Sequence, residues 1–295
     1  MTIHLFLQQL INGLGLGSLY GLIAIGYTMV YGILRLINFA HGDVMMMSTY
    51  FAFFGISVFA LPWWAAALVA MALTALLGIT IDQGAYRPLR RAPRISALIT
   101  AIGVSFFLEN VSLVVFGSRP RPFFRPEMFR PIWHFGGITV LSLTVYTILI
   151  TLGLLVIVYV VVYKTRMGMA MRAVSKDMHT VPLMGIDLNR VIAFTFGFGS
   201  ALAAIGGILW AMKYPQIEPL MGIIPGLKAF VAAVLGGIGN VFGAVLGGFI
   251  LGITEIMLVA FWPELSGYRD AFAFLLLILV LIFRPTGIMG EDLPE

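Results

Sequence analysis

Long apolar stretches separated by short polar loops run through the whole chain. A membrane-spanning helix needs about 20 mostly apolar residues, and several stretches reach that length. A transmembrane barrel would instead show alternating apolar and polar residues. The pattern therefore predicts an all-α integral membrane protein with a single transmembrane domain over residues 1–295. The predicted membrane segments number about eight, some of them broken or re-entrant, and cover residues 6–32, 37–60, 63–82, 95–116, 138–163, 191–213, 226–261 and 270–284.

Two glycine-rich apolar stretches, one in each half of the chain, resemble each other. The first covers residues 17–26 and leads into Asn38-Phe39-Ala40-His41-Gly42-Asp43. The second covers residues 199–207 and leads into Pro225-Gly226 and residues 236–240. We expect a helix break beyond each stretch, at residues 38–43 and 236–240. Hydrocarbon cannot satisfy the unpaired backbone groups of a break, so such breaks lie inside protein or beside a water-filled path.

Breaks of this kind, one in each half, are typical of a transporter with an internal repeat. The ends of a broken helix direct their dipoles at a charged solute, so the breaks are the predicted translocation path. The candidate path residues are Asn38, His41, Asp43, Gly236, Gly237 and Gly239.

Basic loops set the expected orientation. Residues 87–94 and 164–176 are rich in Lys and Arg, which places both on the cytoplasmic side. Counting membrane crossings from these loops places both ends of residues 226–261 on the outer side. The same count makes the two glycine-rich stretches antiparallel. An inverted repeat is therefore a hypothesis. Residues 118–134 carry four arginines but fall outside, which we interpret as a local exception: a solvated loop, or a surface for an acidic partner.

Composition limits the chemistry. The chain has 295 residues, 60% hydrophobic and 11% charged, a mean hydropathy of +1.02 and no cysteine. It has no phosphate-binding loop and no metalloprotease or serine-hydrolase motif, and its histidines are scattered. We therefore expect no catalytic residues, no metal, no cofactor and no nucleic-acid partner. Any ATP hydrolysis belongs to another polypeptide.

Acidic residues within apolar segments are costly and usually face a cavity or a partner group. Four such residues stand out: Asp43, Asp82, Glu109 and Glu255. For each, a structural pairing and a place in a solute or proton path remain alternatives.

One cytoplasmic segment, residues 167–186, is polar but keeps apolar residues at helical spacing, namely Met171, Val174 and Met178. An amphipathic helix that ends at a glycine fits this pattern. It would either dock into a groove of a soluble partner or lie on the membrane surface as a connector.

Several motifs together make the chain resemble the permease subunits of bacterial ABC importers for branched-chain amino acids, most closely the H-type permease. The similarity covers nearly the whole chain. The motifs are Asn38-Phe39-Ala40-His41-Gly42, Ala85-Tyr86-Arg87-Pro88-Leu89, Leu183-Met184-Gly185-Ile186, Lys228-Ala229-Phe230, Gly236-Gly237-Ile238-Gly239 and Arg284-Pro285-Thr286-Gly287.

The resemblance implies a multi-pass protein of the bacterial inner membrane that translocates Leu, Ile and Val. It also implies a second homologous permease subunit, two cytoplasmic ATPase subunits and a periplasmic substrate-binding protein, with lipid around them. The cytoplasmic loop at about residues 164–190 would dock into the ATPase, through a helix over 172–186 that Pro182 would end or restart. The docking candidates are Arg172, Ala173, Ser175, Asp177 and Gly185.

Other functions remain open. The same machinery carrying urea or a short amide is the nearest alternative, and the sequence does not separate the two. An ion-coupled secondary transporter would use Glu109 or Asp43 and would work without an ATPase. An intramembrane enzyme is disfavoured because no nucleophile–base pair is visible.

Overall fold

The computed structural model describes residues 3–90, 92–178 and 180–290, so Arg91 and His179 of the predicted cytoplasmic loops lie outside the described residues. The described part of the chain is an all-α membrane protein with seven helices that are long and apolar enough to cross a bilayer, and a shorter apolar helix. The helices are α1 (Ile3–Leu34), α2 (His41–Ser57), α3 (Trp63–Ile81), α4 (Arg94–Phe116), α5 (Ser142–Lys164), α6 (Arg166–Lys176), α7 (Leu188–Lys213), α8 (Ile223–Gly236), α9 (Val241–Phe261) and α10 (Arg269–Phe283).

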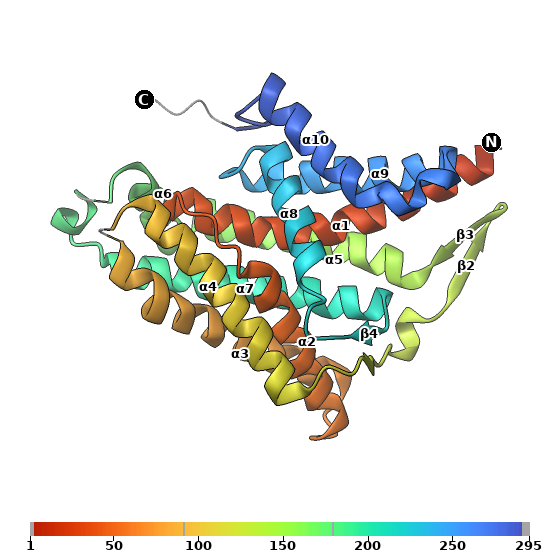
Figure 1. The fold of residues 1–295 in the computed structure, drawn as a ribbon, viewed down its shortest axis with the longest axis horizontal. Coiled ribbons are helices and arrows are strands. Elements are labelled where there is room, and N and C mark those ends of the chain that lie inside the picture. The colour runs from red at the N-terminus through yellow and green to blue at the C-terminus, as the bar shows by residue number, and fades with distance from the viewer. Residues whose placement is uncertain (1–2, 91, 179, 291–295) are drawn as a thin grey trace.

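Four short strands pair into two antiparallel ribbons. Strand β1 (Arg121–Pro122) pairs with β4 (Gln216–Ile217), and β2 (Ile132–Phe135) pairs with β3 (Ile138–Leu141). Figure 1 shows the β2–β3 hairpin and the N-terminus at one end of the molecule and α6 at the opposite end. We call these the hairpin end and the α6 end.

Helix α1 lies at the centre of the bundle and packs closely against α9. A Cβ on Gly17 would lie 2.6 Å from the carbonyl oxygen of Gly248, and a Cβ on Gly13 would lie 2.8 Å from the Cα of Ile253. Small residues allow such close approach where no hydrophobic force drives helices together in lipid. Because Gly13 meets Ile253 and Gly17 meets Gly248, the two helices are antiparallel.

The glycine-rich stretches are not themselves broken. Residues 17–26 lie inside the continuous helix α1, and residues 199–207 lie inside α7. Their glycines serve packing instead, because a Cβ on Gly199 would lie 3.6 Å from the Cα of Gly26, and one on Gly206 would lie 2.9 Å from Ile23. The two stretches therefore run in opposite directions, as the inverted-repeat hypothesis requires.

The chain breaks at the two predicted places, near residues 38–43 and 236–240. After α1 it leaves the helix with Arg35 at φ +55° and re-enters at His41. A side chain on Gly26 would collide with the ring of His41. The first residue of α2 therefore packs against α1 about two helical turns before the end of α1. In the other half, the predicted broken segment 226–261 is two helices, α8 and α9, joined by a turn at residues 237–240.

At the hairpin end, the structure differs from two other expectations. The segment predicted to span 138–163 begins as strand β3, and its helix starts only at Ser142. The arginine-rich segment 118–134 is not simply solvated. Arg125 donates to the carbonyls of Met212 and Lys213 at 2.6 and 3.2 Å, at the end of α7. Arg121 donates to the carbonyl of Phe116 at the end of α4. These cations offset the negative ends of two helices, so two of the four arginines in this segment have a structural role.

Candidate functional site

The N-terminal ends of α2 and α8 meet inside the bundle. A Cβ on Gly226 would lie 2.8 Å from the Cα of Gly42, and one on Gly42 would lie 2.5 Å from the carbonyl oxygen of Gly222. Each helix N-terminus carries partial positive charge, equivalent to roughly half an elementary charge. Glycines at this contact therefore bring two positive helix ends together.

A cavity of about 230 Å³ lies beside this contact, between α1, α2, α4 and α8. Its apolar lining comes from Phe39, Ile102, Phe106, Ile223 and Leu227. Its polar lining comes from Tyr27, Asp43, Ser105 and Glu109. The cavity thus offers an apolar wall, two carboxylates and two helix N-termini in one place.

Two of the three predicted path residues of the first break meet here, but only one lines the cavity. Asp43 is 2% exposed and accepts a 2.5 Å hydrogen bond from Ser105. His41 is buried behind it, with its ring 4.7 Å from that of Tyr27. Asn38 is buried further along and accepts a 2.8 Å hydrogen bond from Tyr86.

The glycines of the second break lie elsewhere. Gly236 and Gly237 sit at the opposite end of α8 from Gly42, where they pack against Gly243 and Gly290. The carbonyl of Gly236 accepts a 2.9 Å hydrogen bond from the Met289 amide. The structure therefore does not bring these glycines together with Asp43, and both have close-packing roles.

Gly239 faces a second cavity, of about 420 Å³, at the α6 end. The φ angles of +107° at Gly237 and +105° at Gly239 make the α8–α9 turn one that glycine favours. The cavity is also lined by Arg35, Arg172 and Lys176, so it is basic.

Helix α6 is held firmly against α5. Met171 and Val174 are buried, which confirms the expected amphipathic face. The guanidinium of Arg172 donates to the carbonyl of Val162 and lies 5.3 Å from the ring of Tyr163. Arg172 thus closes the end of α5 rather than projecting from the molecule.

The rest of the predicted docking segment is a compact turn, so one helix over 172–186 is wrong. Asp177 ends α6 and accepts a 2.8 Å hydrogen bond from the Thr180 hydroxyl. Pro182 lies at the start of a separate 3-10 turn, Val181–Met184, where its missing N–H is tolerated. Gly185 then ends that turn with φ +79°. Ala173 is partly buried against the core, and Ser175 bonds back to the carbonyl of Arg172.

The tip of this turn carries two apolar side chains that the docking prediction did not include. Leu183 is 87% exposed and Met184 is 76% exposed. Exposed apolar side chains at a polar turn are candidates for contact with a partner. Their signal in the sequence was the pattern Leu183-Met184-Gly185, an apolar pair before a turn glycine.

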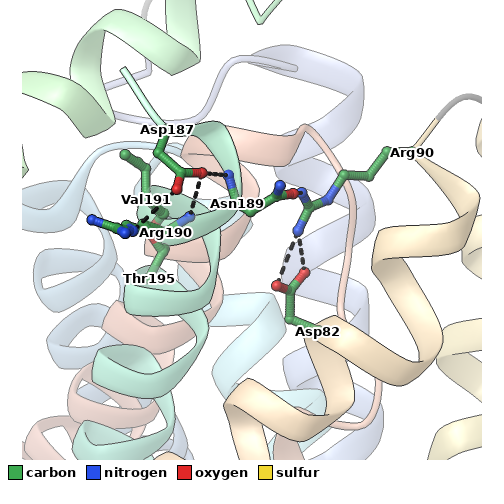
Figure 2. A network of polar contacts seen from close by, with 7 residues as sticks. All are labelled: Asp82, Arg90, Asp187, Asn189, Arg190, Val191 and Thr195. Carbon is green, nitrogen blue, oxygen red and sulfur yellow. Dashed lines mark hydrogen bonds and ion pairs between the residues drawn. The ribbon is translucent and has the colours of Figure 1, made fainter. Parts of the chain in front are cut away.

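A polar network ties the end of this turn to α3 (Figure 2). Asp187 caps α7 by accepting from the amides of Asn189 and Arg190 at 3.0 and 3.3 Å. Arg90 then joins Asn189, at 2.8 Å, to Asp82, at 2.7 Å. Asp82 therefore has a structural pairing, and the start of α7 is linked to the end of α3.

Glu255 also has a pairing. It lies between α1, α8 and α9, where it accepts hydrogen bonds from Tyr20 and Lys228. Lys228 was not among the candidates, although it stands in one of the recognised motifs. Within the described residues, no group of three or more His, Asp or Glu side chains is arranged to hold a metal ion.

Comparisons with known proteins agree on one family. The family described as "Branched-chain amino acid transport system / permease component" matches residues 9–281. The high-affinity branched-chain amino acid transport system permease protein BraD of Pseudomonas aeruginosa is 43% identical over 98% of this chain and 97% of its own length. The corresponding permease protein LivH of Escherichia coli K12 is 43% identical over 97% of this chain and 96% of its own.

A solved structure shares the fold. PsaBC from Streptococcus pneumoniae, in complex with Fab, superposes with a TM-score of 0.51 and covers 97% of this chain and 94% of its own. The sequence identity is 13%, so this likeness concerns the arrangement of helices alone.

Proposed function

Because this chain belongs to the family of branched-chain amino acid transport system permease components, we propose that it is the transmembrane permease subunit of an ATP-driven importer of Leu, Ile and Val. The observation that carries this proposal is the near-full-length identity to permeases of that substrate class. It favours branched-chain amino acids over urea and over an ion-coupled mechanism.

In this proposal the chain is one transmembrane domain in the bacterial inner membrane, with the α6 end in the cytoplasm. The basic cavity at that end, with Arg35, Arg172 and Lys176, supports this orientation. Few residues of the helices α3, α4, α5 and α10 are buried inside the bundle. Lipid and a second homologous permease subunit would cover those faces, and a periplasmic binding protein would deliver substrate at the hairpin end.

Two partner ATPase subunits would hydrolyse ATP, and one would receive the turn at Leu183 and Met184 in an apolar cleft. The other docking candidates hold that turn in place. Arg172 and Ala173 fix α6 against the bundle, Ser175 and Asp177 close its last turn, and Gly185 reverses the chain.

We place the translocation path at the cavity beside Asp43 and its exit near Gly239. ATP binding would move the docking turn, and the Asp187–Asn189–Arg90–Asp82 network would carry that motion to α3 and α7. Partners can shift the balance of outward- and inward-facing states only if they bind the two states differently.

The test is uptake of labelled leucine in cells with and without the chain, with urea as the alternative solute. We expect uptake of leucine that needs both the chain and ATP. Leucine uptake that survives ATP depletion while the proton gradient is held would move the protein to the secondary transporters, and uptake of urea alone would move it to the urea permeases.

The docking turn is tested by replacing both Leu183 and Met184 with Asp. Charged side chains would keep the ATPase from binding, so we expect loss of both ATP-driven uptake and copurification of the ATPase. The matched control is Met128→Asp, an exposed methionine at the hairpin end. Equal copurification for both variants would remove the ATPase from this turn.

A further inference from the structure

The cavity beside α2 holds two carboxylates that share one hydroxyl. Ser105 lies 2.5 Å from Oδ2 of Asp43 and 3.5 Å from Oε1 of Glu109. Ser105 and Glu109 are one turn apart on α4, and Ile102 and Phe106 lie on the same helix face. One side of α4 therefore presents both polar and apolar groups to the cavity.

Asp43 has unused capacity for a hydrogen bond. Its Oδ1 is buried and has no hydrogen-bond partner among the described residues. Leaving a buried acceptor unpaired costs about 1–3 kcal/mol, and more for a charged group. Asp43 lines the cavity, so a donor bound there would lie next to this carboxylate.

The carboxylates also lack a cation. None of the described residues that line this cavity is Lys, Arg or His. Two carboxylates facing one small space repel each other unless a positive group lies between them or one of them takes up a proton. In this respect they differ from Glu255 and Asp82, which pair with Lys228 and Arg90.

The remaining surfaces fit the rest of a small zwitterion. The N-termini of α2 and α8 add positive helix-dipole charge beside the cavity, which favours a negative group within it. The apolar wall, which includes Phe106 and Leu227, suits an aliphatic side chain. A cavity of about 230 Å³ is smaller than the usual pocket for a drug-sized ligand, as expected for a smaller solute.

We propose that Asp43 and Glu109, bridged by Ser105, bind the α-ammonium group of an aliphatic amino acid during its passage through this chain. The site rests on the proposed function, since it assigns a role to residues of the same path. It gives the permease its own preference for a zwitterion, in addition to any preference of the binding protein.

The experiment uses the complete transport complex, purified without its binding protein. Three probes separate the groups of the solute: L-leucine, 3-methylbutylamine, which lacks the carboxylate, and 4-methylpentanoate, which lacks the ammonium. Binding is read as a rise in the thermal unfolding midpoint, because a ligand that binds only the folded state stabilises it. We expect L-leucine and 3-methylbutylamine to raise the midpoint and 4-methylpentanoate to leave it unchanged.

Asp43→Asn and Glu109→Gln should abolish both shifts and raise the KM of leucine uptake by about tenfold, the loss expected for one hydrogen bond to a charged group. The amide introduced by Asp43→Asn can still accept from Ser105, and Glu109 is only half-buried, so at least one variant should fold. Glu264→Gln, an exposed carboxylate near α10, is the matched control and should behave as the unaltered protein.

Three results would overturn the proposal. The first is an unfolding midpoint and a KM in both variants that respond to leucine as in the unaltered protein, and the second is a midpoint rise with 4-methylpentanoate equal to that with leucine. The third is a midpoint that is higher in sodium chloride than in choline chloride, with a difference that Asp43→Asn removes. The last would assign the carboxylates to a metal cation. Failure of the proposed function is a different result, because it would be absence of ATP-driven leucine uptake by the unaltered protein.

Discussion

The Nζ of Lys228 on α8 lies 2.9 Å from Oε1 of Glu255 on α9, and both side chains are only 5% exposed. Lys228 also lies 2.6 Å from Asp270 at the start of α10, and the hydroxyl of Tyr20 on α1 donates to the other oxygen of Glu255. One buried lysine therefore joins four helices. The pairing assigns Glu255 to the packing of the bundle, away from the cavity at Asp43.

Lys228→Met should destabilise the protein strongly. Removing one partner leaves a buried carboxylate without a counter-charge, which costs about 3–5 kcal/mol. The double variant Lys228→Met with Glu255→Gln should recover part of this loss, because the amide can still accept from Tyr20. Thermal unfolding in detergent measures both, with the exposed Lys164→Met as control. A single variant as stable as the parent would show that the pair contributes nothing.

Arg125→Ala should lower stability by about 1.5–3 kcal/mol, the range for hydrogen bonds to a charged group. The side chain donates to two carbonyls at the end of α7, and those carbonyls have no further turn of helix to bond. The unfolding midpoint of this variant is compared with that of Arg119→Ala, which removes an exposed arginine from the same segment. Equal midpoints would mean that Arg125 does not act as a cap.

The sequence was sufficient for the class of fold because the lengths of apolar stretches follow directly from bilayer thickness. Glycine content alone was not sufficient for the position of the helix breaks. Glycine permits a helix break, but it also permits close helix packing. The glycines of residues 17–26 serve close packing. The real break, between Arg35 and His41, was identified by the polar motif that follows the stretch.

Long-range contacts explain what the sequence could not indicate at the site. Arg172 looks like a surface contact because arginine is usually exposed, yet it bonds a carbonyl ten residues away in α5. Leu183 looks like a core residue because leucine is usually buried, yet it is exposed. Asp43 was selected from its position at a break, while its partner Ser105 depends on how α4 packs against α2.

Gly17→Ala should destabilise the protein by about 1–3 kcal/mol, the usual cost of overpacking. The added methyl group would lie 2.6 Å from the carbonyl oxygen of Gly248 and 2.7 Å from the Cα of Phe249, both backbone atoms. Gly153→Ala on α5 is the matched control. Apart from its neighbours and the nearby backbone of α5 itself, no atom of the described residues lies within 4 Å of the added methyl group there, so the change should be neutral or slightly stabilising. If the two variants unfold at the same temperature, α1 and α9 are not as close as described.

Asn189→Ala should lower the amount of leucine transported per ATP hydrolysed more than it lowers stability. The change removes the 2.8 Å hydrogen bond that links Arg90 to the start of α7, and it leaves the 2.7 Å pair between Arg90 and Asp82 intact. If motion of the docking turn reaches α3 through this bond, hydrolysis would continue while transport falls. The adjacent Arg190→Ala is the control. Arg190 pairs with Asp187, but their side chains are 83% and 49% exposed, respectively, and such surface pairs contribute little to stability. Transport and hydrolysis are measured together in proteoliposomes, and an unchanged ratio for Asn189→Ala would show that the coupling takes another route, such as the contact of Arg172 with α5.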